Sequence, residues 1–68
     1  MATKEDIKKF REDAIKLMVR DIKESDRNGV PPEEIWDNMN VKANYSYYST
    51  EEDKIKAFKK AGFTVEIS

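Results

Sequence analysis

The first part of the chain has the hydrophobic spacing of an amphipathic helix. Apolar residues recur at three- and four-residue steps and therefore share one face of a helix; they are Ile7, Phe10, Ala14, Leu17, Met18 and Ile22. Thr3, followed three residues later by Asp6, is suited to cap the start of this helix. Gly29 is suited to end it, because glycine adopts the positive φ of a helix C-terminus without strain. The pattern predicts a long helix over residues 4–28.

Two shorter helices follow from capping and breaking signals. Pro31-Pro32 stops the first helix, and Pro32 before two glutamates fits the first turn of a new one. We therefore expect a helix over residues 32–39, with apolar contacts from Ile35, Trp36 and Met39. Both Ser49…Glu52 and Thr50…Asp53 have the spacing of a capping box, and Gly62 is suited to end the helix that follows, so a third helix is predicted over residues 50–61.

Two segments change from helical spacing to strict alternation, which is typical of strands. Apolar and aromatic residues alternate with others over 41–47 (Val41, Ala43, Tyr45, Tyr47) and over 63–67 (Phe63, Val65, Ile67). Strands joined through one helix normally pair in parallel. The connection here is near the lower length limit, so antiparallel pairing stays open. We predict a single small α+β domain of order α-α-β-α-β, in which the long N-terminal helix packs on a two-stranded sheet with a crossover helix.

The composition excludes several classes of chemistry. The 68 residues include 13 Lys and Arg, 14 Asp and Glu, and neither cysteine nor histidine. Disulfide frameworks, cysteine zinc sites and thiol catalysis are therefore excluded, and the commonest general base is missing. Both glycines are accounted for as helix caps, so no phosphate-binding loop remains. We expect a protein that is not an enzyme, with no cofactor and no metal.

The apolar runs are too short for a membrane helix, since the longest is Leu17–Val19. A cytoplasmic protein is the expectation.

Aromatic residues provide the strongest candidate for binding. Trp36, Tyr47 and Tyr48, with Lys42 nearby, form the predicted partner-binding set, because tryptophan and tyrosine are enriched at interaction hot spots. Alternation places Tyr47 and Tyr48 on opposite faces, so at least one ring is expected to face solvent. The competing interpretation makes Trp36 and Tyr45 members of the core. We predict a small non-catalytic binding protein that docks on a larger protein, as a regulator or inhibitor of the size that phages often encode.

Two alternatives stay open. Lys56, Lys59 and Lys60 share the outer face of the third helix, and with Tyr47 and Tyr48 they would form a surface for single-stranded nucleic acid. The formal net charge of -1 speaks against it, and an ordinary solvated helix face, with Glu52 paired to Lys56, is the favoured explanation of these lysines.

The second alternative is a structural homo-oligomer. Ile15 and Val19 widen the apolar arc of the first helix to about half of its circumference, and a homodimer would bury them.

Overall fold

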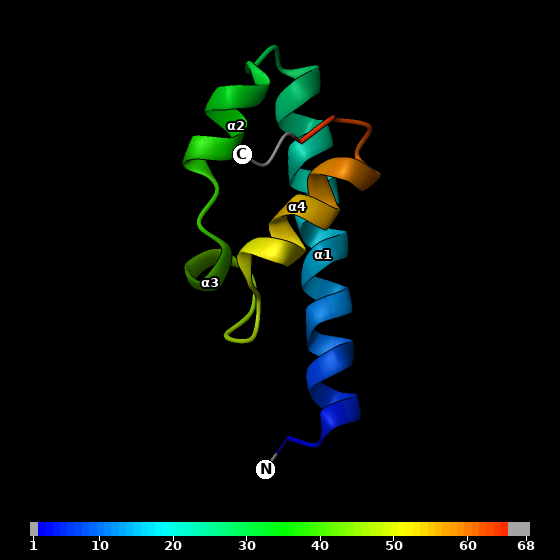
Figure 1. Cartoon of the computed structure of the whole chain (residues 1–68). Helices are drawn as coiled ribbons and strands as arrows, with labels where there is room; N and C mark the ends of the chain where they lie inside the picture. The colour runs from blue at the N-terminus through cyan, green and yellow to red at the C-terminus, as the bar shows by residue number, and fades with distance from the viewer. Residues whose placement is uncertain (1, 66–68) are drawn as a thin grey trace.

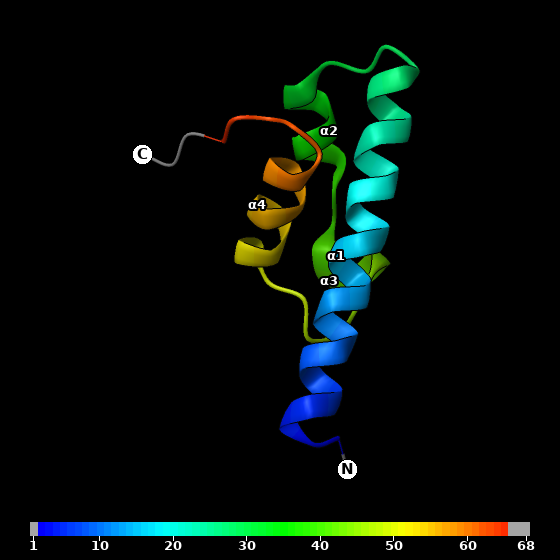
Figure 2. The ribbon, with the colours of Figure 1, turned by 90° about the vertical axis from the view of Figure 1, so that its right-hand side faces the viewer.

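The computed structural model describes residues 2–65, and these residues form an all-helical arrangement (Figure 1). The helices are α1 (Lys4–Arg27), α2 (Pro32–Asn38), α3 (Val41–Asn44) and α4 (Glu51–Lys60). Within residues 2–65 there is no strand, so the predicted α+β fold with a two-stranded sheet is wrong. The long helix α1 supports the others, with α4 and α2 packed along one side of it (Figure 2). Its first turns extend beyond the other helices in both views.

Local hydrogen bonds explain where α1 begins and ends. The Thr3 hydroxyl accepts the Asp6 N–H at 3.1 Å, and the Asp6 carboxylate accepts the Thr3 N–H at 3.2 Å. At the other end Gly29 has φ +83°, and the Val30 N–H donates to the Ser25 carbonyl at 3.1 Å. These are a capping box and a Schellman motif, so the helix has close to the bounds that the sequence predicts.

Helix α4 uses the same two devices. Of the two candidate boxes, Thr50 and Asp53 form the one in the structure. Gly62 has φ +99°, and the Phe63 N–H donates to the Phe58 carbonyl at 3.0 Å. The ring of Phe63 then packs on that of Phe58, with centroids 5.9 Å apart, which is the hydrophobic contact that often accompanies this motif.

The predicted strand over residues 41–47 is replaced by a helical turn and a tight turn. The Asn40 side chain accepts the Ala43 N–H at 3.3 Å and begins α3. After α3, the Ser49 N–H donates to the Ser46 carbonyl at 3.0 Å. Asparagine and serine favour such local bonds over a sheet ladder. Val41 and Tyr45 are both covered because they lie one helical turn apart, whereas Tyr47, which alternation placed with them, is 84% exposed.

The predicted strand over residues 63–67 is also wrong for the residues described. Phe63, Thr64 and Val65 belong to neither a helix nor a strand. Phe63 and Val65 are half-buried against the core while Thr64 is exposed, so the alternation correctly indicated which side chains turn inward. Ile67, the third inward residue of the prediction, lies outside the described residues. Alternation therefore indicates which side chains are buried, but it does not by itself indicate that the segment pairs with another strand.

The core lies where α1, α2 and α4 meet. Met18 and Ile22 of α1 and Ala57 of α4 have no exposed surface, and Phe58 is 2% exposed. Ile15 is also buried inside the chain, and Val19 is half-buried. Val19 is therefore accessible for a dimer contact on this side of α1, whereas Ile15 is not. Self-association stays a prediction.

Ser49 carries a buried hydroxyl that has no hydrogen-bond partner among residues 2–65. A buried polar group without a partner costs about 1–3 kcal/mol. We expect Ser49→Ala to raise the free energy of unfolding by about 1 kcal/mol, as measured by urea denaturation. Ser46→Ala is the matched control, because the Ser46 hydroxyl accepts the Tyr48 N–H at 3.2 Å and its loss should be destabilising. A lower midpoint for Ser49→Ala would mean that its hydroxyl has a partner.

Candidate partner-binding surfaces

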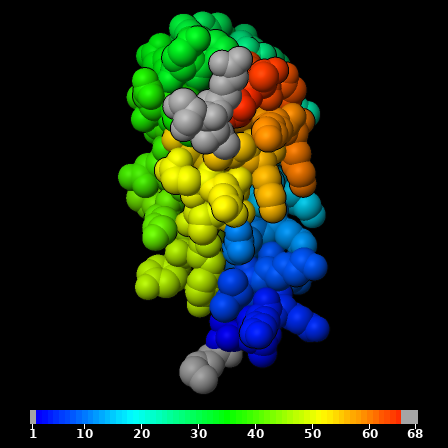
Figure 3. Space-filling model, viewed as in Figure 1, coloured from blue at the N-terminus to red at the C-terminus, as the bar shows by residue number. Residues whose placement is uncertain are grey.

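The exposed apolar side chains gather along one side of α1. Within the described residues, the large hydrophobic residues with the greatest exposure are Tyr47 (84%), Leu17 (49%) and Phe10 (48%). Phe10 and Leu17 are seven residues apart and share a helix face. We call Phe10, Leu17, Tyr47 and Tyr48 the apolar patch. Figure 3 shows the loop between α3 and α4, which carries Tyr47 and Tyr48, at the surface against the N-terminal half of α1.

Ring stacking fixes the tyrosines of the apolar patch in place. The rings of Phe10 and Tyr48 stack with an interplanar angle of 6° and centroids 6.1 Å apart. Tyr47 meets Tyr48 edge to face, with centroids 5.4 Å apart. Tyr48 is thereby half-buried and acts as a base for the exposed ring of Tyr47. Aromatic pairs of this kind add about 0.5–1.5 kcal/mol beyond the area that they bury, so the patch is organised before any partner arrives.

A hydrogen bond anchors the same segment further along α1. The Tyr45 hydroxyl donates to the Asp21 carboxylate at 2.9 Å. Burial, followed by this hydrogen bond and the negative charge of Asp21, raises the pKa of Tyr45 to about 12. Tyr45 therefore stays a neutral donor at physiological pH. Its support of the fold is fully present below the ordinary tyrosine pKa of about 10 and is lost as the pH rises from there towards 12.

Trp36, another member of the predicted set, packs in a different place from the apolar patch, and Lys42 has no hydrogen bond or cation–π contact with the patch within the described residues. Trp36 is half-buried and packs on Phe58, with ring centroids 5.1 Å apart. The Lys54 ammonium lies 4.0 Å from the centroid of the Trp36 ring. Lys42 is exposed on α3. Of the predicted set, ring contacts in the described residues join Tyr47 to Tyr48, and they add Phe10 of α1.

Phe10 and Leu17 were missed as surface residues because their spacing assigned them to the packed face. Both lie at one edge of the apolar arc of α1, on the side of the helix that also carries Asp21. The covered residues Met18 and Ile22 lie nearer the middle of the arc. An arc of half the circumference is wider than the other helices of so short a chain can cover. That width was the signal in the sequence that some apolar positions stay exposed.

The lysines of α4 do not join the tyrosines. Lys56 borders a hollow on α1 together with Lys8 and Arg11. Phe10 and Arg11 are consecutive and project about 100° apart, so Lys56 and Tyr48 face different sides of α1. Lys59 and Lys60 are exposed in the last turn of α4, where the negative end of the helix dipole favours cations.

A partly buried ion pair links α1 to α4. Asp53 is 1% exposed, and both of its carboxylate oxygens accept hydrogen bonds from the Arg11 guanidinium, at 2.9 and 3.0 Å. Burial acts to raise the pKa of Asp53, but the hydrogen bonds from Arg11 and from the Thr50 N–H outweigh it and lower the pKa below its ordinary value. Asp53 is thus ionised at neutral pH and committed to holding the two helices together.

The described residues contain neither a three-residue cluster of metal-ligating side chains nor a membrane-spanning helix. Between residues 2 and 65, no three histidine, cysteine or carboxylate side chains gather closely enough to hold a metal ion. In the same range, no helix is both long and apolar enough to cross a bilayer. Comparisons with protein-family models, with curated proteins and with solved structures find no match to this chain, so its surfaces carry the functional argument.

Proposed function

We propose that this chain is a small non-catalytic binding protein that docks on a larger protein through the apolar patch, as a regulator or inhibitor. The absence of cysteine supports a cytoplasmic site of action, because secreted domains of this size usually depend on disulfides.

The observation that carries the proposal is the gathering of exposed apolar side chains in one place. Phe10 and Tyr47, each about half exposed or more, both pack on the ring of Tyr48. The half-exposed Leu17 lies two turns further along the same face of α1. Keeping such side chains in water forgoes about 25 cal/mol per Å² of burial, and contiguous exposed apolar surface marks interaction sites. Tyrosine and phenylalanine also lose little conformational entropy on binding.

The test compares the apolar patch with the lysines of α4. Affinity capture from host extract, with and without nuclease, identifies the partner, and titration then measures the affinity of variants. We expect Tyr47→Ala to weaken binding by more than about fivefold, which corresponds to about 1 kcal/mol. Because Tyr47 is 84% exposed, the variant should stay folded, with a melting temperature lowered by only a few degrees through the lost contact with Tyr48.

The control is the triple variant Lys56→Gln, Lys59→Gln, Lys60→Gln. On a protein partner it should alter mainly the association rate. A nucleic-acid function would replace our proposal if capture is sensitive to nuclease and if the triple variant, but not Tyr47→Ala, loses both binding and the salt dependence of the affinity.

A further inference from the structure

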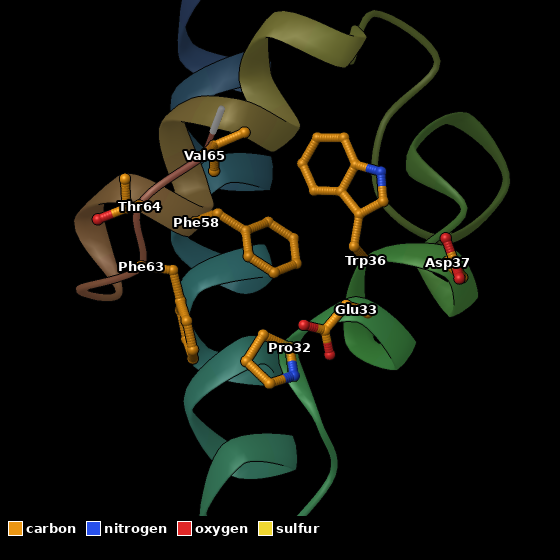
Figure 4. A pocket seen from close by; sticks show the side chains of 8 residues that line it. All are labelled: Pro32, Glu33, Trp36, Asp37, Phe58, Phe63, Thr64 and Val65. Atoms are coloured by element: carbon orange, nitrogen blue, oxygen red, sulfur yellow. The ribbon is translucent and has the colours of Figure 1, made fainter. Parts of the chain in front are cut away.

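A second surface feature, separate from the apolar patch, lies between α2 and the C-terminal end of α4. It is a hollow of about 400 Å³, which we call the Trp36 hollow. Figure 4 shows the side chains that border it: Pro32, Glu33, Trp36, Asp37, Phe58, Phe63, Thr64 and Val65. This volume falls in the range of small-ligand sites, which are typically apolar with a few polar groups.

Three aromatic rings form the wall of the Trp36 hollow. Phe58 lies between the other two rings, 5.1 Å from Trp36 and 5.9 Å from Phe63 between centroids. The electron-rich face of an indole attracts cations, and the chain already uses this property, since the Lys54 ammonium lies 4.0 Å from the centroid of the Trp36 ring. Lys54 is not one of the residues that line the hollow. The wall therefore suits a cation with an apolar or flat body.

Carboxylates complete the rim. Glu33 and Asp37 are one turn apart on α2 and border the same hollow. In Figure 4 the Glu33 carboxylate lies between Pro32 and Trp36, and Asp37 lies beyond the indole. In the described part of the chain, neither carboxylate has a lysine or arginine nitrogen within 4.0 Å. Asp37 is also in the last turn of α2, where the helix dipole adds negative potential.

We propose that the Trp36 hollow binds an arginine side chain presented by a partner protein. A guanidinium is flat and weakly hydrated, stacks on aromatic rings and donates paired hydrogen bonds to a carboxylate. The hollow offers both of these recognition elements, with Glu33 and Asp37 as the acceptors. Lysine has the charge but neither the flat face nor the paired donors. This proposal does not depend on the apolar patch, which lacks carboxylates.

The test uses Nα-acetyl-arginine amide as the probe and the full chain as the receptor. Trp36 is the single tryptophan of the sequence, so its fluorescence and its indole N–H resonance report on this hollow directly. We expect saturable binding with a Kd of about 1 mM, the affinity usual for a ligand of this size. The neutral isostere Nα-acetyl-citrulline amide and the corresponding lysine amide should each bind at least about fivefold more weakly.

A matched pair of variants locates the site. Glu33→Gln should weaken binding of the arginine probe at least about fivefold, because it removes the charge that pairs with the guanidinium. Glu34→Gln removes the same charge from the same helix, but Glu34 borders a different hollow, beside Asp21 and Met39. It should leave the affinity unchanged, and thermal melts of both variants exclude unfolding.

Three results would overturn the proposal: no saturation by the arginine probe, equal affinity for the citrulline amide, or equal losses in Glu33→Gln and Glu34→Gln. Loss of partner binding in Tyr47→Ala tests the apolar patch alone, so either proposal can fail without the other.

Discussion

Ile22→Ala is expected to bring the chain close to unfolding at room temperature. Ile22 has no exposed surface and lies in the core between α1 and its neighbours. Truncating a buried isoleucine costs about 2–5 kcal/mol, through lost burial and the cavity left behind. A chain of 68 residues has a total stability of only about 3–10 kcal/mol. Urea denaturation followed by circular dichroism should show a midpoint lowered by a third or more.

Leu17→Ala is the matched control for Ile22→Ala. Leu17 lies on the same helix, but it is 49% exposed, so its truncation should change the free energy of unfolding by less than about 1 kcal/mol. Equal midpoints for the two variants would contradict the position of the core. The same Leu17→Ala protein also tests the apolar patch, because it is expected to fold normally and to bind the partner less tightly.

The second large effect is expected for Asp53→Ala, which removes three hydrogen bonds at once. Two come from the Arg11 guanidinium and one from the Thr50 N–H. Hydrogen bonds to a charged group contribute about 1.5–3 kcal/mol, but the Arg11 side chain is 36% exposed, and solvent weakens its share. We expect a loss of about 2–3 kcal/mol in the free energy of unfolding.

Asp6→Ala provides an internal comparison for Asp53→Ala. Asp6 has the same capping-box position at the start of α1, but it is exposed, and its carboxylate accepts only the Thr3 N–H in the hydrogen bonds of the described residues. Its loss should cost about 0.5–1 kcal/mol. The difference between the two variants measures what burial and Arg11 add. Equal losses would mean that the ion pair contributes nothing to stability.

The acid stability of the fold should depend on the same carboxylate. Because the pKa of Asp53 is lower in the folded chain than its ordinary value, its ionised form stabilises the fold. This contribution is fully present above the unfolded pKa of about 4 and is lost as the pH falls through the folded value. The Asp53→Ala variant should therefore show a flatter decline in stability below pH 4 than the parent chain.

The parts of the fold that the sequence predicted are those determined by neighbouring residues. Thr3, Thr50, Gly29 and Gly62 act on backbone groups within a few positions, so the ends of α1 and α4 could be predicted from spacing alone. The strand prediction for Val41 to Tyr47 was wrong because the spacing of its apolar residues is compatible with both a strand and a helix. Val41 and Tyr45 lie two steps apart in an alternating strand, but they also lie one turn apart in a helix.

The candidate sites depended on contacts between distant parts of the chain. Tyr47 was predicted as a binding residue from its type, and its exposure is consistent with that prediction. The stacking of Tyr48 on Phe10 could not be predicted, since it requires the loop before α4 to lie against α1. Phe63 and Val65 were expected to turn inward because they alternate with Thr64. The hollow that they line together with Trp36 depends on where α2 lies.

The first turns of α1, which extend past the other helices, have a consequence for the dynamics of this protein. An isolated helical turn is marginally stable in water, and here the support comes mainly from the Thr3–Asp6 box and the half-buried Ile7. The amide hydrogens of these turns should therefore exchange with solvent through local fraying, while those around Met18 exchange only when the whole chain opens. Phe10 lies at the boundary between the two regimes. A partner that covers Phe10 would slow amide exchange in the first turns of α1, so binding would be detected as increased protection of those amides.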